Sequence, residues 1–103
     1  MYLYKHPIFK NYACDNSGNI INLQTGTIRK PHTPKCGYKE VKIKGKHVLV
    51  HRFVWEAYNN ECLPKGYEVN HINKNKHDNR PNNLEALTIQ EHRNFHKKGT
   101  GAK

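Results

Sequence analysis

Two histidines and one asparagine in the last third of the chain are spaced so that they could hydrolyse a phosphodiester. His71 stands near the end of a predicted strand, Asn83 follows twelve residues later, and His92 lies nine residues further on. An imidazole that titrates near neutral pH is suited to taking a proton from water. An imidazole and a neighbouring oxygen ligand can hold one divalent cation and leave positions for phosphate and water.

The elements that must position these residues follow the order strand, loop, strand, helix. Residues 67–72 are typical of a short strand, residues 73–83 form an asparagine-rich loop, and residues 84–88 predict a second strand. Thr88 and Glu91 make a capping-box pattern, which predicts a helix from there to about residue 96 and a frayed end beyond it. A hairpin with this helix folded across it would bring the strand end and the helix face together in a cleft.

Three stretches of this unit resemble the HNH endonuclease family, in particular its phage and intron homing type. They are VNHINKNK at 69–76, NRPNNLE at 79–85 and LTIQEH at 87–92. The resemblance extends over about residues 49–96, and residues 12–43 are similar to a small β module often found ahead of the unit. It implies a ββα-metal fold, in which a hairpin and a helix surround one divalent ion.

Matched by position, the resemblance implies that His71 is the general base and that Asn83 holds the loop backbone and so fixes His71. Asn70 and His92 would be metal ligands, and His96 a further ligand or a DNA contact. Many relatives have Asp or His in place of Asn70, and relatives of this type commonly have Asn in place of His92. The ligand pair here is one amide and one imidazole, and it brings no negative charge to the ion. We therefore expect weak ion binding until a DNA phosphate completes the site. The expected ion is Mg²⁺ or Mn²⁺, with Zn²⁺ or Ni²⁺ as further options.

The charge balance predicts a polyanionic partner, and double-stranded DNA is the one that the resemblance implies. The chain has 103 residues, with 18 Lys or Arg against 8 Asp or Glu, a net charge of +10. The alternative is a merely solvated basic surface. The candidate DNA contacts are Arg29, Lys30, Lys42 and Lys44 in the first half, and Lys74, Lys76 and Arg80 in the loop beside the site. The sequence leaves open a homodimer or a larger phage complex.

The predicted fold class is α+β, with a short antiparallel β-sheet module and one helix ahead of the hairpin-helix unit. We divide this compact domain into a basic β module (1–50), a linking helix and turn (51–66), the HNH unit (67–98) and a flexible tail (99–103). Within it, strands are expected at 12–14, 19–23, 38–44 and 46–50, and a helix at 51–58 that packs through Phe53, Val54, Ala57 and Tyr58. His51 is expected to cap or pack this helix.

Other features bear on location. There is no apolar run long enough for a membrane span and no apolar signal stretch near the start. The three cysteines form no C-x-x-C motif, which favours reduced thiols over a disulfide framework or a zinc ribbon. We therefore expect a cytoplasmic protein.

The leading hypothesis is a metal-dependent DNA endonuclease, encoded by a phage or mobile element, that nicks one strand per active site. The resemblance implies products with a 5′-phosphate and a 3′-hydroxyl. Two alternatives stay open at this point: a nucleic-acid-binding module with a degenerate metal site, and a nuclease subunit that acts only with a partner protein.

The same charge predicts DNA affinity that falls steeply with salt, because each phosphate contact releases counterions. Sequence preference should be modest, since one small sheet reads few base pairs. Fluorescence anisotropy with a labelled duplex measures the affinity at low and moderate salt. A loss of affinity below about fourfold between about 50 and about 200 mM salt would contradict several phosphate contacts.

Overall fold

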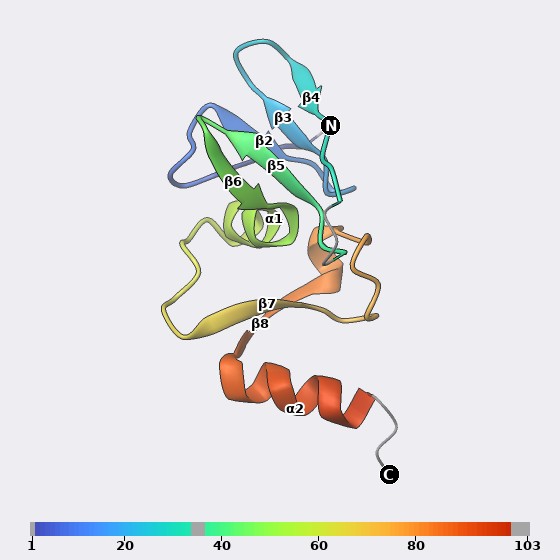
Figure 1. Cartoon of the computed structure of the whole chain (residues 1–103). Coiled ribbons are helices and arrows are strands. Elements are labelled where there is room, and N and C mark those ends of the chain that lie inside the picture. The colour runs from blue at the N-terminus through green and yellow to red at the C-terminus, as the bar shows by residue number, and fades with distance from the viewer. Residues whose placement is uncertain (1, 34–36, 100–103) are drawn as a thin grey trace.

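The computed structural model describes residues 2–33 and 37–99, with side chains up to residue 94 (Figure 1). The described elements, in chain order, are β1 (Tyr4–Lys5), β2 (Tyr12–Cys14), β3 (Ile20–Asn22), β4 (Thr27–Arg29), β5 (Glu40–Ile43), β6 (Lys46–Leu49), α1 (Val50–Asn59), β7 (Tyr67–His71), the 3₁₀ turn η1 (Pro81–Asn83), β8 (Leu84–Thr88) and α2 (Ile89–Gly99). No helix in this part of the chain is both long and apolar enough to cross a membrane.

The first half forms two small antiparallel sheets. Strands β1 to β4 make a meander in sequence order, and β5 and β6 pair as a separate hairpin. The hairpin turns at Lys44 and Gly45, which both have positive φ, as a two-residue primed turn requires. The hairpin was predicted from this turn, whereas β1 and β4 were missed, because strands of two or three residues show no alternation.

Alternation along β5 creates one apolar and one polar face. Val41 and Ile43 are buried, and Lys42 between them is exposed, as predicted. Helix α1 begins one residue earlier than predicted, and its Phe53 and Val54 join these side chains in the core. Tyr58 was expected in the core as well. It is 44% exposed and instead packs against the edge of the Tyr4 ring at the end of the helix.

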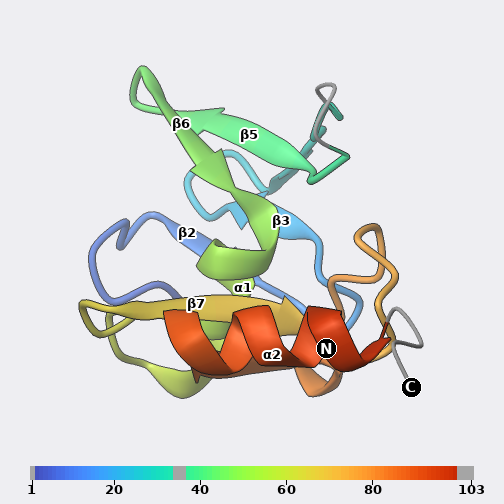
Figure 2. The ribbon, with the colours of Figure 1, turned by 60° about the horizontal axis from the view of Figure 1, so that its bottom comes forward.

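The HNH-like hairpin β7–β8 lies between the two helices (Figures 1 and 2). Because side chains alternate along a strand, Val69 and His71 of β7 face α1, and Glu68 and Asn70 face α2. This alternation places neighbouring residues of one strand in contact with two different helices. The α+β class predicted from the sequence is confirmed.

Helix α2 begins with both hydrogen bonds of the predicted capping box. The Glu91 amide donates to Thr88 Oγ1 at 3.1 Å, and the Thr88 amide donates to Glu91 Oε1 at 2.9 Å. The helix continues to Gly99, past the end predicted near residue 96. The cap therefore fixes where α2 leaves β8, and so which of its side chains faces β7.

Glu56 of α1 ties three parts of the chain together. Its side chain accepts a hydrogen bond from His6 Nε2 at 2.8 Å and another from the Leu63 amide at 2.8 Å. The other ring nitrogen of His6 accepts from the amides of Ile8 and Phe9. These bonds hold the N-terminal segment and the connection to β7 against the same helix.

The β2–β3 turn contacts the loop between β7 and β8 at one glycine. Gly18 has φ +85°, and a Cβ placed there would lie 2.3 Å from the carbonyl oxygen of Asn79. Asp15 shapes the turn by accepting from the amides of Ser17 and Asn19. The first half of the chain therefore supports the loop directly.

Substituting Gly18 with alanine should cost more stability than the same change at Gly26. Both have positive φ, but nothing lies within 4 Å of a Cβ at Gly26. Gly26→Ala should therefore cost only the backbone strain, about 1 kcal/mol, and Gly18→Ala about 1–3 kcal/mol more, because the loop must move. Urea denaturation of both variants measures the difference, and equal losses would contradict the close approach.

Candidate active site

His71 ends β7 and is almost completely buried. Its Nε2 lies 2.7 Å from Oδ1 of Asn79. Because a carboxamide oxygen only accepts hydrogen bonds, Nε2 carries the proton and Nδ1 is the basic nitrogen of the ring. The loop thus fixes both the orientation and the tautomer of this imidazole.

Two further rings stack beside His71. His51, at the start of α1, has its ring centroid 4.8 Å from that of His71 and 5.0 Å from that of Tyr38. Burial, followed by the neighbouring His71, lowers the pKa of His51 to about 3, so this ring is neutral at physiological pH. Burial also lowers the pKa of His71, against the opposing effect of the bond to Asn79. Both shifts favour the neutral form of the ring.

Asn83 holds the loop closed from its buried position in η1. Its Oδ1 accepts from the Asn73 amide at 3.1 Å, and its Nδ2 donates to Asn73 Oδ1 at 3.0 Å and to the Asp78 carbonyl at 2.9 Å. Both ends of the loop are thereby joined through one side chain. This is the contact with the loop backbone that the sequence analysis expected of Asn83.

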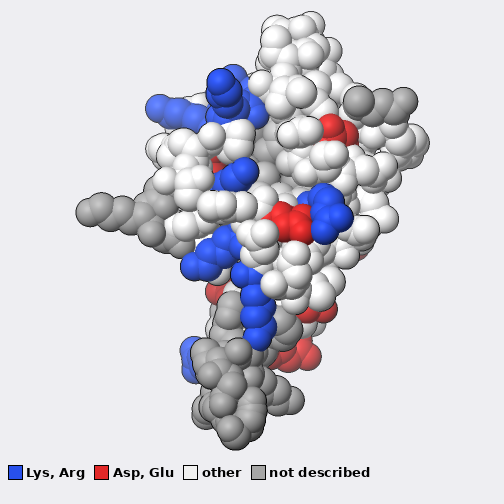
Figure 3. Space-filling model, turned by 90° about the vertical axis from the view of Figure 1, so that its right-hand side faces the viewer, with Lys and Arg blue, Asp and Glu red and all other residues white. Residues whose placement is uncertain are grey.

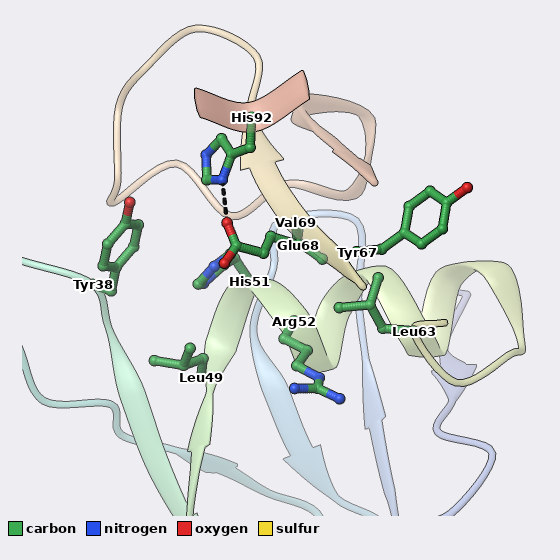
Figure 4. A pocket seen from close by; sticks show the side chains of 9 residues that line it. All are labelled: Tyr38, Leu49, His51, Arg52, Leu63, Tyr67, Glu68, Val69 and His92. Atoms are coloured by element: carbon green, nitrogen blue, oxygen red, sulfur yellow. Dashed lines mark hydrogen bonds and ion pairs between the residues drawn. The ribbon is translucent and has the colours of Figure 1, made fainter. Parts of the chain in front are cut away.

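Asn70 and His92 each contact a carboxylate. Asn70 is 1% exposed, and its Nδ2 donates to Glu85 Oε2, across the hairpin, at 2.9 Å. His92 projects from α2 towards β7, and its Nδ1 lies 2.6 Å from Glu68 Oε1 (Figure 4). The amide and the imidazole therefore have an anionic group beside each of them.

Three of the predicted catalytic and metal residues line one small cavity, and Asn83 is not among its walls. Asn70, His71 and His92 line it together with Lys74 and Lys76, and Tyr38 closes one side. Its volume is about 20 Å³, room for little more than one water molecule. A wider cavity of about 330 Å³ adjoins it and shares Tyr38 and His92, with Glu68, His51 and Arg52 among its other walls (Figure 4).

Comparison with known proteins assigns this arrangement to a family. Residues 48–94, from β6 into α2, match the family model described as HNH endonuclease. The chain is also 32% identical over 82 residues to the DNA endonuclease I-HmuI of Bacillus phage SP01, covering 76% of this chain and 47% of that protein. The chain belongs to the HNH endonuclease family.

Two further likenesses agree with this membership. An uncharacterized HNH endonuclease of Acanthamoeba polyphaga mimivirus is 35% identical over 89 residues, which cover 81% of this chain and 22% of that protein. A solved structure of DNA binding and cleavage by the HNH homing endonuclease I-HmuI superposes with a TM-score of 0.79 and 27% identity, over 100% of this chain and 61% of that one. The chain spans less than half the length of the two curated relatives.

Several residues of this HNH site were not predicted from the sequence. Asn79 was quoted only as part of the motif, although it holds His71, and Glu68 was not considered. His51 was expected to cap or pack α1, and Tyr38 was assigned no role. Glu68 precedes Asn70 by two residues, so strand alternation alone could have placed both on the α2 side.

The predicted DNA contacts differ in their surroundings: two line the small cavity, two are bound to other groups of the chain, and three are exposed in the first half. Lys74 and Lys76 line the small cavity, and the Lys76 amino group lies over the Tyr38 ring, 4.7 Å from its centroid. Arg80 is bound to Asp78 through two contacts of 2.7 and 2.8 Å, and Arg29 is turned inward, where it donates to the Lys42 carbonyl at 2.6 Å.

The remaining candidates lie on the surface of the first half or beyond the described side chains. Lys30, Lys42 and Lys44 are exposed on and beside the small sheets. His96 lies in α2, outside the side chains that the structure describes. On the side of the molecule where the loop lies, Lys and Arg side chains follow one another down the face towards α2 (Figure 3).

Removing the Asn83 side chain should loosen the HNH loop. Asn83→Ala deletes three hydrogen bonds at a buried position and should cost about 1–3 kcal/mol of unfolding free energy. Amide exchange at Asn73 should quicken at the same time. Asn82→Ala, at the exposed neighbouring position, is the matched control and should change neither quantity. Equal effects of the two substitutions would contradict this role.

Proposed function

We propose that this chain is the catalytic part of a metal-dependent endonuclease that nicks one strand of double-stranded DNA. The observation that carries the proposal is the convergence of Asn70, His71 and His92 on one cavity that two lysines also line. The family membership and the likeness to I-HmuI support it. Because the site has one general base, it would hydrolyse one phosphodiester at a time, which is a nick in one strand.

His71 takes the proton from the attacking water in this proposal. The proton goes to Nδ1, because Nε2–H is held by Asn79 Oδ1. Asn83 keeps the loop in the conformation that presents Asn79, and the tilted His51 ring packs beside that of His71. The imidazole is thus oriented before DNA arrives, and no rearrangement has to accompany proton transfer.

The donor set at the cavity fits a divalent ion. Because Asn70 Nδ2 donates to Glu85, Asn70 would offer Oδ1 to the ion, and His92 would add an imidazole nitrogen from α2. Among the described residues no three His, Cys, Asp or Glu side chains come together as a metal cage, so a bound ion would need further ligands, which the phosphate and water could supply. When bound, the ion supplies positive charge to the phosphate and to the leaving oxygen.

Lys74 and Lys76 supply the remaining positive charge at the reacting phosphate. Both side chains line the cavity that His71 lines. A phosphate at the mouth of this cavity would exchange hydration for contacts with these ammonium groups and would bring the scissile bond towards Nδ1 of His71. The exposed Lys30, Lys42 and Lys44 extend the basic surface along the duplex.

A plasmid-nicking assay tests this function. The protein should convert supercoiled plasmid to the open circular form with Mg²⁺ or Mn²⁺, and a chelator should stop the reaction. His71→Ala should lower the rate by about 100-fold or more, because general-base catalysis is lost. His77→Ala removes an exposed histidine of the same loop and should leave the rate near that of the parent.

Three outcomes would overturn the proposal. Nicking that survives in His71→Ala would exclude this residue as the base. DNA binding without nicking, with every ion tried, would support the alternative of a non-catalytic binding module. Nicking that appears only after a partner protein is added would support the accessory-subunit alternative.

A further inference from the structure

The contact between Glu68 and His92 brings a negative charge to a site whose predicted ligands are neutral. Glu68 Oε1 lies 2.6 Å from His92 Nδ1, the shortest side-chain contact described at the site. A carboxylate only accepts, so Nδ1 carries a proton and donates it. The His92 side chain is 15% exposed and Glu68 is half-exposed, so the bond joins a largely enclosed ring to a group at the rim.

The positions of the two residues tie this bond to the site. Glu68 and Asn70 are two residues apart on β7, so both project from the face that α2 covers. His92 lines both the small cavity with Asn70 and the wider cavity with Glu68. In Figure 4 the second ring nitrogen of His92 points away from Glu68, towards the side where Tyr38 lies. Tyr38 and His92 both also line the small cavity that Asn70 and His71 line.

A bond of this kind alters the imidazole as a ligand in three ways. It fixes the tautomer with the proton on Nδ1, it holds the plane of the ring, and it makes the opposite nitrogen more basic. It also places an anionic charge next to His92, and so one contact away from a cation that His92 would bind. Each effect favours metal binding through Nε2 of His92.

We propose that Glu68 is a positioning residue of the metal site. Glu68 holds the His92 ring so that Nε2 is presented to a divalent cation. This inference rests on the proposed function, because it assigns the cation to the same cavity. It revises the expectation of an uncharged site. The ligands themselves are neutral, but the carboxylate behind His92 compensates part of the cation's charge.

The competing explanation is that the pair only fastens α2 to β7. In that case Glu68→Ala would leave the metal affinity unchanged. It would also cost little unfolding free energy, because surface ion pairs contribute little to stability. The two explanations therefore differ in a measurement of metal binding and agree in a measurement of unfolding.

Mn²⁺ binding to Glu68 variants tests the proposal. The background is His71→Ala with a short bound duplex, so that phosphates complete the site and nothing is cleaved. Free Mn²⁺ is followed by electron paramagnetic resonance, with the duplex alone as the blank. Glu68→Ala should weaken Mn²⁺ binding at least about tenfold. Glu68→Gln, which keeps an acceptor but loses the charge, should fall between Glu68→Ala and the parent.

A second readout follows His92 itself. Imidazole ¹⁵N shifts in the DNA-free protein should show the proton on Nδ1 in the parent and in Glu68→Gln, and a mixture of tautomers in Glu68→Ala. Glu61→Ala is the control, because Glu61 is exposed after α1 and lines neither cavity. It should match the parent in both measurements. Circular dichroism shows whether each variant is folded.

The outcomes separate this inference from the proposed function. Parental Mn²⁺ affinity in folded Glu68→Ala would overturn the role of Glu68 and leave the nuclease proposal standing. The absence of metal-dependent nicking by the parent protein would overturn the proposed function first. Reduced Mn²⁺ affinity together with a shifted tautomer in Glu68→Ala would support the inference, and reduced affinity with an unchanged tautomer would contradict it.

Discussion

The hydrogen bond from His71 Nε2 to Asn79 Oδ1 is the contact on which the site depends, because it decides which nitrogen of this imidazole can accept a proton. Asn79 can hold that bond only if the loop backbone lies where it does. Gly18 sets that position by approaching the Asn79 carbonyl more closely than any other residue type allows. Asp15 in turn fixes the turn that carries Gly18. The position of the His71 ring therefore depends on a turn of the first sheet.

Because of this dependence, the β module, the linking helix and the HNH unit do not act as separate parts. The HNH motif contains Asn70, His71 and His92, but two rings beside His71 come from residues ahead of β7, namely Tyr38 and His51. Glu56, bonded to His6 and to the Leu63 amide, keeps α1 in place to present His51. The hairpin lies between α1 and α2, so a loss of packing on either side would move a functional ring. The β module is thus part of the support of the site.

Local signals predicted the elements well where one short pattern determines the geometry. The Lys44-Gly45 turn, the alternation of β5 and the capping box at Thr88 all rest on contacts within a few residues, and all are present. What escaped prediction depends on contacts between distant segments. Asn79 acquires its role from Gly18, and Arg29 is turned inward by the Lys42 carbonyl. A residue type and its neighbours do not report such contacts, so Arg29 resembled any other surface cation.

The distribution of acidic side chains follows from the same polar network. In a chain of net charge +10, three of the eight acids lie at the loop or contact Asn70 and His92: Glu68, Asp78 and Glu85. Asp78 binds Arg80 and Asn73, and the Arg80 contact holds the pKa of Asp78 well below its usual range, so it remains charged as a fixed acceptor. Each carboxylate thus contacts the group it orients and leaves the cavity itself to amide, imidazole and ammonium groups. Carboxylates that lined the cavity would repel a phosphate in the absence of a cation, whereas carboxylates one contact further out can orient the cavity side chains with less repulsion.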